Sequence, residues 1–223
     1  MKKIIIAALI CFALSSCVTS LHPLVTYDQV ITEERLAGKW MNDNQEYNVQ
    51  QFVNSGFFNE HKKEFEAEIA KKEKNSGTIG DSILFSKSYV IEYIKNGIQY
   101  DLLGSLIRLN GQLFINFSPI NSKQISDTAK DASLDPGSSL STNIIAKIQV
   151  QNTNALKIEF LDGSFIYDQV VAGRLKIKNE RDVLYETFII TASTQELRQF
   201  LEKYGMDNRL YSKENTVTLI RKS

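Results

Sequence analysis

Apolar and polar residues alternate over much of the chain, and this alternation predicts β-strands. The clearest run covers residues 89–117, which Asn96-Gly97 and Asn110-Gly111 divide into three stretches. An Asn-Gly pair between alternating stretches is the usual two-residue turn of a β-hairpin. Residues 89–117 are therefore predicted to form a three-stranded antiparallel meander. Further strands are expected near residues 38–41, 47–53, 144–150, 156–160, 185–190 and 217–220.

The alternation also predicts how the sheet is buried. Strands with one apolar and one polar face are typical of a sheet that packs on a core and faces water on its other side. We expect a mainly β (α+β) protein, either an antiparallel meander or a closed barrel, with a few peripheral helices. No break in composition divides residues 37–223, which are predicted to be a single β-rich domain.

Three segments between these strands are predicted to be helical. The sequence Ser193-Thr194-Gln195-Glu196 matches a capping box, and the residues that follow it place their apolar side chains on one helical face. A shorter helix is expected over Ser164–Val171, with Phe165 and Val171 facing inward. Residues 58–74 are rich in Glu, Lys and Ala, which favours a solvated helix.

One long segment carries neither pattern. Ser, Asp, Asn, Thr, Pro and Gly fill 16 of the 25 positions of residues 119–143. Loops of this length are uncommon in compact domains. The segment is expected to be either a mobile insertion or a lid over the end of a barrel.

The N-terminus has the three regions of a bacterial lipoprotein signal. Lys2 and Lys3 precede the apolar run Ile4–Leu14, which is too short to span a bilayer. The run ends in Leu14-Ser15-Ser16-Cys17, which resembles a lipobox. The resemblance implies cleavage before Cys17 and acyl chains on that residue. Residues 1–16 are therefore predicted to be the signal peptide, and the membrane is the first expected partner.

Acyl chains on Cys17 would hold the protein durably, because burial contributes ~0.8 kcal/mol per CH₂ group and two or three chains are present in such lipoproteins. Residues 17–36 are predicted to be a lipidated tether, with the alternative that Leu21, Leu24, Val25 and Tyr27 pack onto the domain. By resemblance to sorted lipoproteins, the absence of an acidic residue directly after Cys17 favours the outer membrane, on its periplasmic face.

Charge and cysteine content exclude several functions. The chain has 26 basic and 26 acidic residues, and without the two signal-peptide lysines residues 17–223 carry a net charge of −2. A nucleic-acid-binding protein would show a basic excess, so no nucleic-acid partner is expected. The two cysteines are Cys11 and Cys17, so the predicted domain has no disulfide, thiol nucleophile or cysteine-bound metal.

The sequence offers few groups for catalysis, and no catalytic residue, metal site or cofactor is predicted. His22 lies beside a proline and His61 in a charged segment, away from any nucleophile motif. Glu92 and Asp101 are predicted to oppose each other in one hairpin, either on a wet outer face or as an acid pair.

Two resemblances to known families extend these predictions. Gly38-Lys39-Trp40 resembles the Gly-x-Trp start of lipocalins. The resemblance implies that Trp40 closes one barrel end beneath Arg221. The sequence departs from the lipocalin pattern because the Thr-Asp-Tyr motif is missing. A second resemblance is to uncharacterised bacterial lipoproteins and implies no activity. It is carried by Ser20-Leu21-His22-Pro23-Leu24, Leu36-Ala37-Gly38-Lys39-Trp40, Leu109-Asn110-Gly111-Gln112-Leu113-Phe114 and the residues 190–197.

These features together predict a lipid-anchored, non-enzymatic envelope lipoprotein that binds a small apolar ligand or an envelope protein. The apolar side chains of the meander form either a ligand surface or simply the core; they are Tyr89, Tyr93, Tyr100, Leu102, Leu113 and Phe117. The alternatives are a structural subunit of an envelope assembly, docking through the 197–204 helix, and a carboxylate-based hydrolase.

Overall fold

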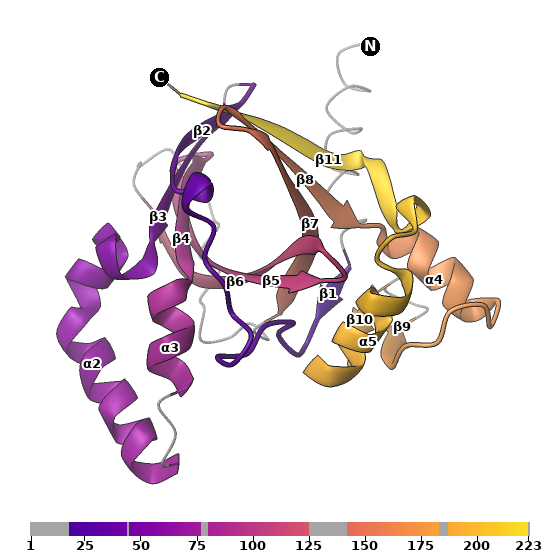
Figure 1. The fold of residues 1–223 in the computed structure, drawn as a ribbon, viewed down its shortest axis with the longest axis horizontal. Helices are drawn as coiled ribbons and strands as arrows, with labels where there is room; N and C mark the ends of the chain where they lie inside the picture. The colour runs from indigo at the N-terminus through magenta and orange to yellow at the C-terminus, as the bar shows by residue number, and fades with distance from the viewer. Residues whose placement is uncertain (1–17, 44, 77–79, 125–141, 183–186, 223) are drawn as a thin grey trace.

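The computed structural model describes residues 18–43, 45–76, 80–124, 142–182 and 187–222. Eight antiparallel strands follow one another around a closed barrel in the order β2-β3-β4-β5-β6-β7-β8-β11, and β11 pairs back with β2 (Figure 1). The molecule is mainly β with a lipocalin-like shape, which confirms the predicted fold class. The barrel strands are β2 Gly38–Asn42, β3 Gln45–Gln51, β4 Tyr89–Lys95, β5 Ile98–Leu109, β6 Gln112–Gln124, β7 Asn143–Asn152, β8 Ala155–Leu161 and β11 Tyr211–Arg221.

The predicted meander is β4, β5 and β6. Asn96 and Gly97 have φ angles of 53° and 77°, and Asn110 and Gly111 have 47° and 79°. Positive φ at both turn positions is what the Asn-Gly pairs predicted. The predicted loop starts too early, because β6 continues through Pro119 to Gln124 in register with β5. The predicted loop also ends too late, because Asn143 already belongs to β7. Residues 125–141 of that loop lie outside the described residues.

Between β8 and β11 the chain leaves the barrel and packs against its outside. This excursion contains α4 Gly163–Val171, β9 Asn179–Asp182, β10 Thr187–Ile190, α5 Thr194–Tyr204 and the short η3 Asn208–Leu210. The predicted capping box is present at Ser193 and Glu196. Helix α4 is confirmed, but Val171 is 55% exposed and does not face inward, because Ile166 holds the buried position of that helix.

A helical hairpin covers the opposite side of the barrel (Figure 1). The chain makes the short turn η2 Phe52–Asn54 after β3, then forms α2 Gly56–Ser76 and α3 Gly80–Lys87 before β4. Helix α2 is the predicted solvated helix, extended by a few residues at each end. Its start is fixed by Ser55, whose Oγ accepts from the Phe58 amide at 3.1 Å, as is typical of a helix N-cap.

More of the outer face of the barrel is buried from solvent than the alternation predicts. One core cluster fills the barrel, whereas a second lies outside it and joins β5, β6 and β7 to α5 and α4. Ile107, Phe114 and Ile145 point outward and are at most 2% exposed. The prediction of a wet outer face is therefore wrong for these strands. The excursion between β8 and β11 covers them, and a sheet covered on both faces carries apolar residues on both faces.

The N-terminal segment is part of the folded body. Val18 is 4% exposed and Leu24 is fully buried, and both belong to the outer core cluster. Strand β1 Thr19–Ser20 pairs with β7 and β10. From residue 18 onward the predicted tether is therefore absent, and the segment packs on the domain through Leu24 and Val25 as the alternative predicts, whereas Tyr27 is 42% exposed. Residues 1–16 and Cys17 lie outside the described residues.

Candidate functional site

One end of the barrel is closed by three residues that the sequence singles out. The Arg221 guanidinium carbon lies 4.3 Å from the ring centroid of Trp40, which is fully buried. Trp40 Nε1 donates to the Leu36 carbonyl at 2.9 Å. Gly38 has a φ of 142°, and a Cβ there would collide with the Arg221 guanidinium. The arrangement is the one that the Gly-x-Trp resemblance implies.

Arg221 also ties together the backbone around this closed end. Its Nη1 donates to the Ala37 carbonyl at 2.9 Å and its Nε to the Thr153 carbonyl at 2.7 Å. A cation over an indole ring contributes ~0.5–2 kcal/mol, depending on burial. In Figure 1 the N-terminal segment crosses this end before entering β2. Arg221, Trp40 and Gly38 therefore have a structural role at a barrel end that is covered.

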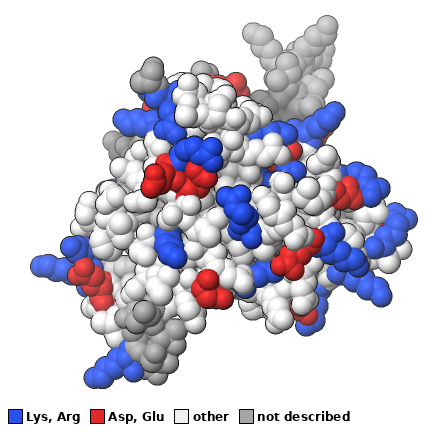
Figure 2. Space-filling model, viewed as in Figure 1, with Lys and Arg blue, Asp and Glu red and all other residues white. Residues whose placement is uncertain are grey.

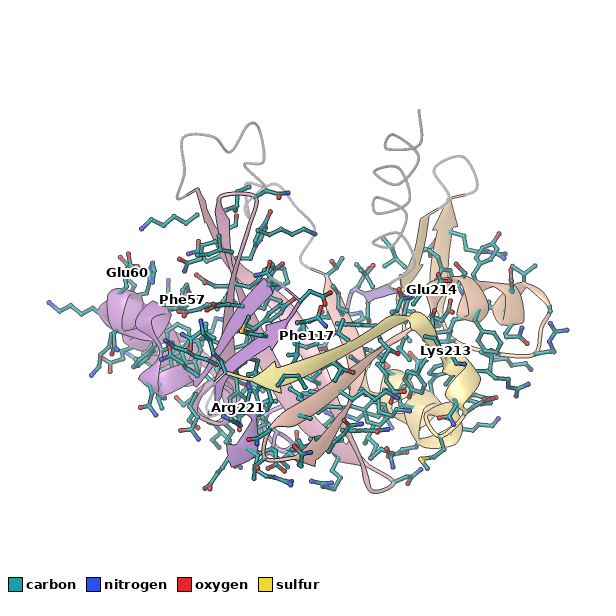
Figure 3. All side chains as sticks on the ribbon, turned by 90° about the horizontal axis from the view of Figure 1, so that it is seen from above. Phe57, Glu60, Phe117, Lys213, Glu214 and Arg221 are labelled. Atoms are coloured by element: carbon teal, nitrogen blue, oxygen red, sulfur yellow. The ribbon has the colours of Figure 1, made fainter. Side chains whose placement is uncertain are left out.

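The apolar residues of the meander form the core of the barrel. Tyr89 is fully buried, and Leu113 and Phe117 are at most 8% exposed. In Figure 3 Phe117 lies between the barrel strands, whereas Phe57 lies outside them on α2. Tyr93 stacks on Tyr100 with ring centroids 5.1 Å apart, and burial raises the pKa of Tyr93 to about 12. Tyr89, Leu113 and Phe117 are therefore core residues, whereas Tyr93, Tyr100 and Leu102 are only partly buried.

An open aromatic site lies outside the barrel, between η2, α2 and α3. Phe52, Phe65 and Phe85 form its base, with ring centroids 4.5–5.0 Å apart. Phe52 is 1% exposed, whereas Phe65 and Phe85 are half-buried. We call this hollow the phenylalanine groove. Its volume is about 320 Å³, and it is lined by Phe52, Val53, Phe58, Phe65, Glu66, Ile69, Ala70, Ser82, Phe85 and Ser86.

The chemistry of the phenylalanine groove suits an uncharged apolar molecule. Its base presents ring faces and edges. Among the described residues that line the groove, Glu66 is the one charged side chain, and it pairs with Lys62 at 3.9 Å. Sites for small molecules are mostly apolar hollows of about 300–1,000 Å³ with a few polar groups. The groove lies at the lower end of that range and offers little hydrogen bonding, so it would bind by burying apolar surface.

The predicted carboxylate pair faces away from the barrel interior. Glu92 and Asp101 are register partners, as the turn predicted. Glu92 accepts from Asn48 Nδ2 at 2.7 Å. Asp101, 2% exposed, accepts from Gln99 at 3.0 Å and from Asn121 at 3.1 Å. Amide side chains therefore hold each carboxylate, and the predicted wet face is wrong for Asp101.

A buried ion pair closes another part of the outer wall. Lys147, whose side chain is 4% exposed, lies 3.1 Å from Glu159, and Lys157 lies 2.7 Å from the other Glu159 oxygen. Lys147 also lies 3.9 Å from the ring centroid of Tyr211. Burial opposes ionisation of Glu159, but the two lysines outweigh it and hold the pKa of its carboxyl below the ordinary value.

The remaining candidates are dispersed. His22 is exposed, and the His61 ring packs on Phe57 with centroids 4.7 Å apart. Within the described ranges, no three His, Cys, Asp or Glu residues are grouped so that they could hold a metal ion.

The apolar face of α5 is buried in the outer core through Leu197, Phe200 and Leu201, so it is not the free docking face that the assembly alternative requires.

Sequence reasoning missed the phenylalanine groove. It predicted a solvated helix over residues 58–74 but did not predict α3, which supplies Phe85. The available signal was the number of phenylalanines between residues 52 and 85, which exceeds what a solvated helix needs for its own packing. Only the return of α3 beside α2 brings them together.

Membrane segments and relatives give no further information on the site. In the part of the chain that the structure describes, no helix has the length and apolar character needed to cross a bilayer. Comparisons with family models, with curated proteins and with solved structures find no match for this chain. Its function must therefore be inferred from its own residues.

Proposed function

We propose that this protein is a lipid-anchored, non-enzymatic lipoprotein of the cell envelope that binds a small apolar ligand in the phenylalanine groove. The observation that carries the ligand proposal is the contrast in burial between two aromatic sets. The barrel interior is packed around Trp40 and Tyr89, which are fully buried, whereas Phe65 and Phe85 line an open hollow of about 320 Å³.

The anchor proposal depends on the sequence Leu14-Ser15-Ser16-Cys17 and its resemblance to a lipobox. Attachment at Cys17 would place the acyl chains one residue from Val18, which is already packed in the outer core. The barrel would then sit directly on the membrane surface, on the periplasmic face of the outer membrane. A ligand leaving the bilayer would have a short path to the protein.

The ligand proposal is tested by titrating the protein with N-phenyl-1-naphthylamine, an apolar dye that fluoresces when buried. Ala70 lines the groove and is exposed, so Ala70→Trp fills the groove without removing a core residue. We expect Ala70→Trp to weaken dye binding by at least about tenfold, which corresponds to ~1.4 kcal/mol. Phe65→Ala should weaken it about three- to tenfold, because an aromatic contact contributes ~0.5–1.5 kcal/mol.

Ala67→Trp is the matched control, since Ala67 is exposed on the same helix and does not line the groove. It should leave the affinity for the dye unchanged. Equal loss of binding in Ala67→Trp and Ala70→Trp would contradict the proposal. So would dye binding that survives Ala70→Trp but is lost in Tyr100→Ala, because that result would place the ligand inside the barrel.

The anchor is tested by cell fractionation of two cysteine variants. Cys17→Ser removes the sulfur that would carry the lipid, so the protein is expected to move from the membrane fraction to the soluble fraction. Cys11→Ser is the control and should remain in the membrane fraction. Membrane association that persists in Cys17→Ser would contradict lipid anchoring at this residue.

A further inference from the structure

The excursion between β8 and β11 carries two further hollows. They differ from the phenylalanine groove because charged side chains line them. One, about 620 Å³, lies between α5 and the segment after α4; the other, about 520 Å³, lies between α4, α5 and η3. Both are lined by Leu175 and Tyr204, so they meet at these two side chains. We call the two together the cationic groove.

The floor of the cationic groove is apolar and part of the outer core. Leu175 is 9% exposed, Phe200 is 4% exposed and Leu210 is 1% exposed. These residues belong to the same core cluster as Val18, the residue next to the predicted anchor site. The floor is therefore a continuation of the folded core to the surface, where it offers apolar side chains to an alkyl chain.

The rim of the cationic groove is basic. Figure 2 shows Lys and Arg side chains gathered at the right-hand edge, where Figure 1 has α4 and the segment after it. Five basic residues and two acidic residues line the groove, a local excess of three positive charges on a chain with no net charge. The basic residues are Arg174, Lys176, Lys178, Lys203 and Arg209.

Two of these cations are already neutralised. Lys178 lies 2.8 Å from Glu196, and Arg209 lies 2.6 Å from Asp207. Hydrogen bonds from Lys178 and from the N-cap residue lower the pKa of Glu196 to about 2, so this partner stays ionised at neutral pH. Within the described residues Lys176 and Lys203 have no ion pair, and the Lys203 ammonium lies 4.8 Å from the ring centroid of Tyr204.

We infer that the cationic groove binds a single anionic lipid, with its carboxylate or phosphate head between Lys176 and Lys203 and its alkyl chain over Leu175 and Phe200. Charge complementarity selects the head, because charge-assisted hydrogen bonds from ammonium groups are the strong ones. The apolar floor selects a lipid over a free anion, since removing an alkyl chain from water is favourable in proportion to the apolar area buried. This site is independent of the phenylalanine groove, which lies across the barrel (Figure 1).

The test uses the full-length protein and two fluorescent probes, 11-(dansylamino)undecanoic acid and its methyl ester. The probes share one chain and differ in the negative charge. We expect the acid to bind at least about tenfold more tightly than the ester, at one site per chain. The double variant Lys176→Gln/Lys203→Gln should remove that difference and leave the affinity for the ester unchanged.

The control is Lys87→Gln/Lys213→Gln, which removes two exposed lysines outside the groove. It should preserve the preference for the acid. Three results would overturn the inference: equal loss in both double variants, equal affinity for acid and ester, or displacement of the acid by millimolar inorganic phosphate. Ala70→Trp should not alter binding of the acid, so failure of this proposal and of the apolar-ligand proposal can be distinguished.

Discussion

The closed barrel end and the phenylalanine groove are both aromatic, yet they use aromatic side chains in opposite ways. At the closed end Trp40 is fully buried, its N–H is hydrogen-bonded, and Arg221 covers its ring. In the groove, Phe65 and Phe85 contact each other edge to face and leave part of their surface open. The first set holds the fold, whereas the second leaves apolar surface for another molecule.

The difference shows that the number of aromatic residues does not by itself locate a binding site. What matters is whether the surrounding chain covers them. At the closed end the Arg221 guanidinium covers the Trp40 ring. Three backbone carbonyls accept hydrogen bonds from this guanidinium and hold it in place. The groove stays open because α2 is solvated on most of its surface and α3 is short.

The largest expected effect is on stability at the closed end. Trp40→Ala should lower the free energy of unfolding by ~3–5 kcal/mol, because it removes a fully buried aromatic side chain and leaves a cavity. Phe65→Ala should cost no more than about half of that, since its ring is half-buried. Trp40 is the single tryptophan of the chain, so Trp40→Ala has no tryptophan fluorescence. Urea denaturation of both variants is therefore followed by circular dichroism. Equal losses would remove the distinction between the two regions.

A smaller effect is expected when the charge at the closed end is kept but its geometry is changed. Arg221→Lys should destabilise the protein by ~1–2 kcal/mol, because the carbonyls of Arg35, Ala37 and Thr153 are contacted by three different guanidinium nitrogens. A lysine carries its three donors on one nitrogen and has no planar group to stack on Trp40. Dye binding in the phenylalanine groove should not change. Thermal denaturation and dye titration of the same sample check both outcomes.

The smallest effect is a pH dependence that separates folding from ligand binding. Burial acts to raise the pKa of Glu159, but Lys157 and Lys147 together hold it below its ordinary value. The contribution of Glu159 to stability is therefore complete above the unfolded-state pKa, near 4.5, and is lost as the pH falls through the lower folded-state pKa. Glu159→Gln should flatten this acid limb of the stability curve.

Ligand binding provides the contrast, because the phenylalanines that form the base of the groove do not titrate. Dye affinity should stay constant between about pH 7 and pH 5, where the protein is folded. A dye affinity that followed the stability curve would show that the groove and the Glu159 cluster are coupled. Urea titrations and dye titrations at matched pH values supply the measurement.

The barrel could be predicted from sequence because its signals are local. The Asn-Gly pairs at 96–97 and 110–111 set the hairpins, and the register between Glu92 and Asp101 follows from the first turn. The Trp40–Arg221 contact was accessible only through a family resemblance, since the two residues are on the first and last barrel strands.

The parts of the fold that the sequence did not predict depend on tertiary packing. Strand β1 has two residues, too few for any periodicity, and exists because β7 and β10 offer it partners. The outward burial of Ile107, Phe114 and Ile145 needs the excursion between β8 and β11 to fold over them. The cationic groove likewise appears only when Lys176 and Lys203, from different segments, lie on one rim.

The closure of the barrel by β2 and β11 determines when the chain can finish folding. Arg221 bonds to Ala37 across 184 positions of sequence, so nearly the whole polypeptide must be available before this contact forms. Contacts of such long separation form slowly. Until β11 arrives, β2 and β8 each present an unpaired edge, which is a template for association between chains. A chain that stops before its final strand is thus an aggregation-prone open sheet, and not a smaller barrel.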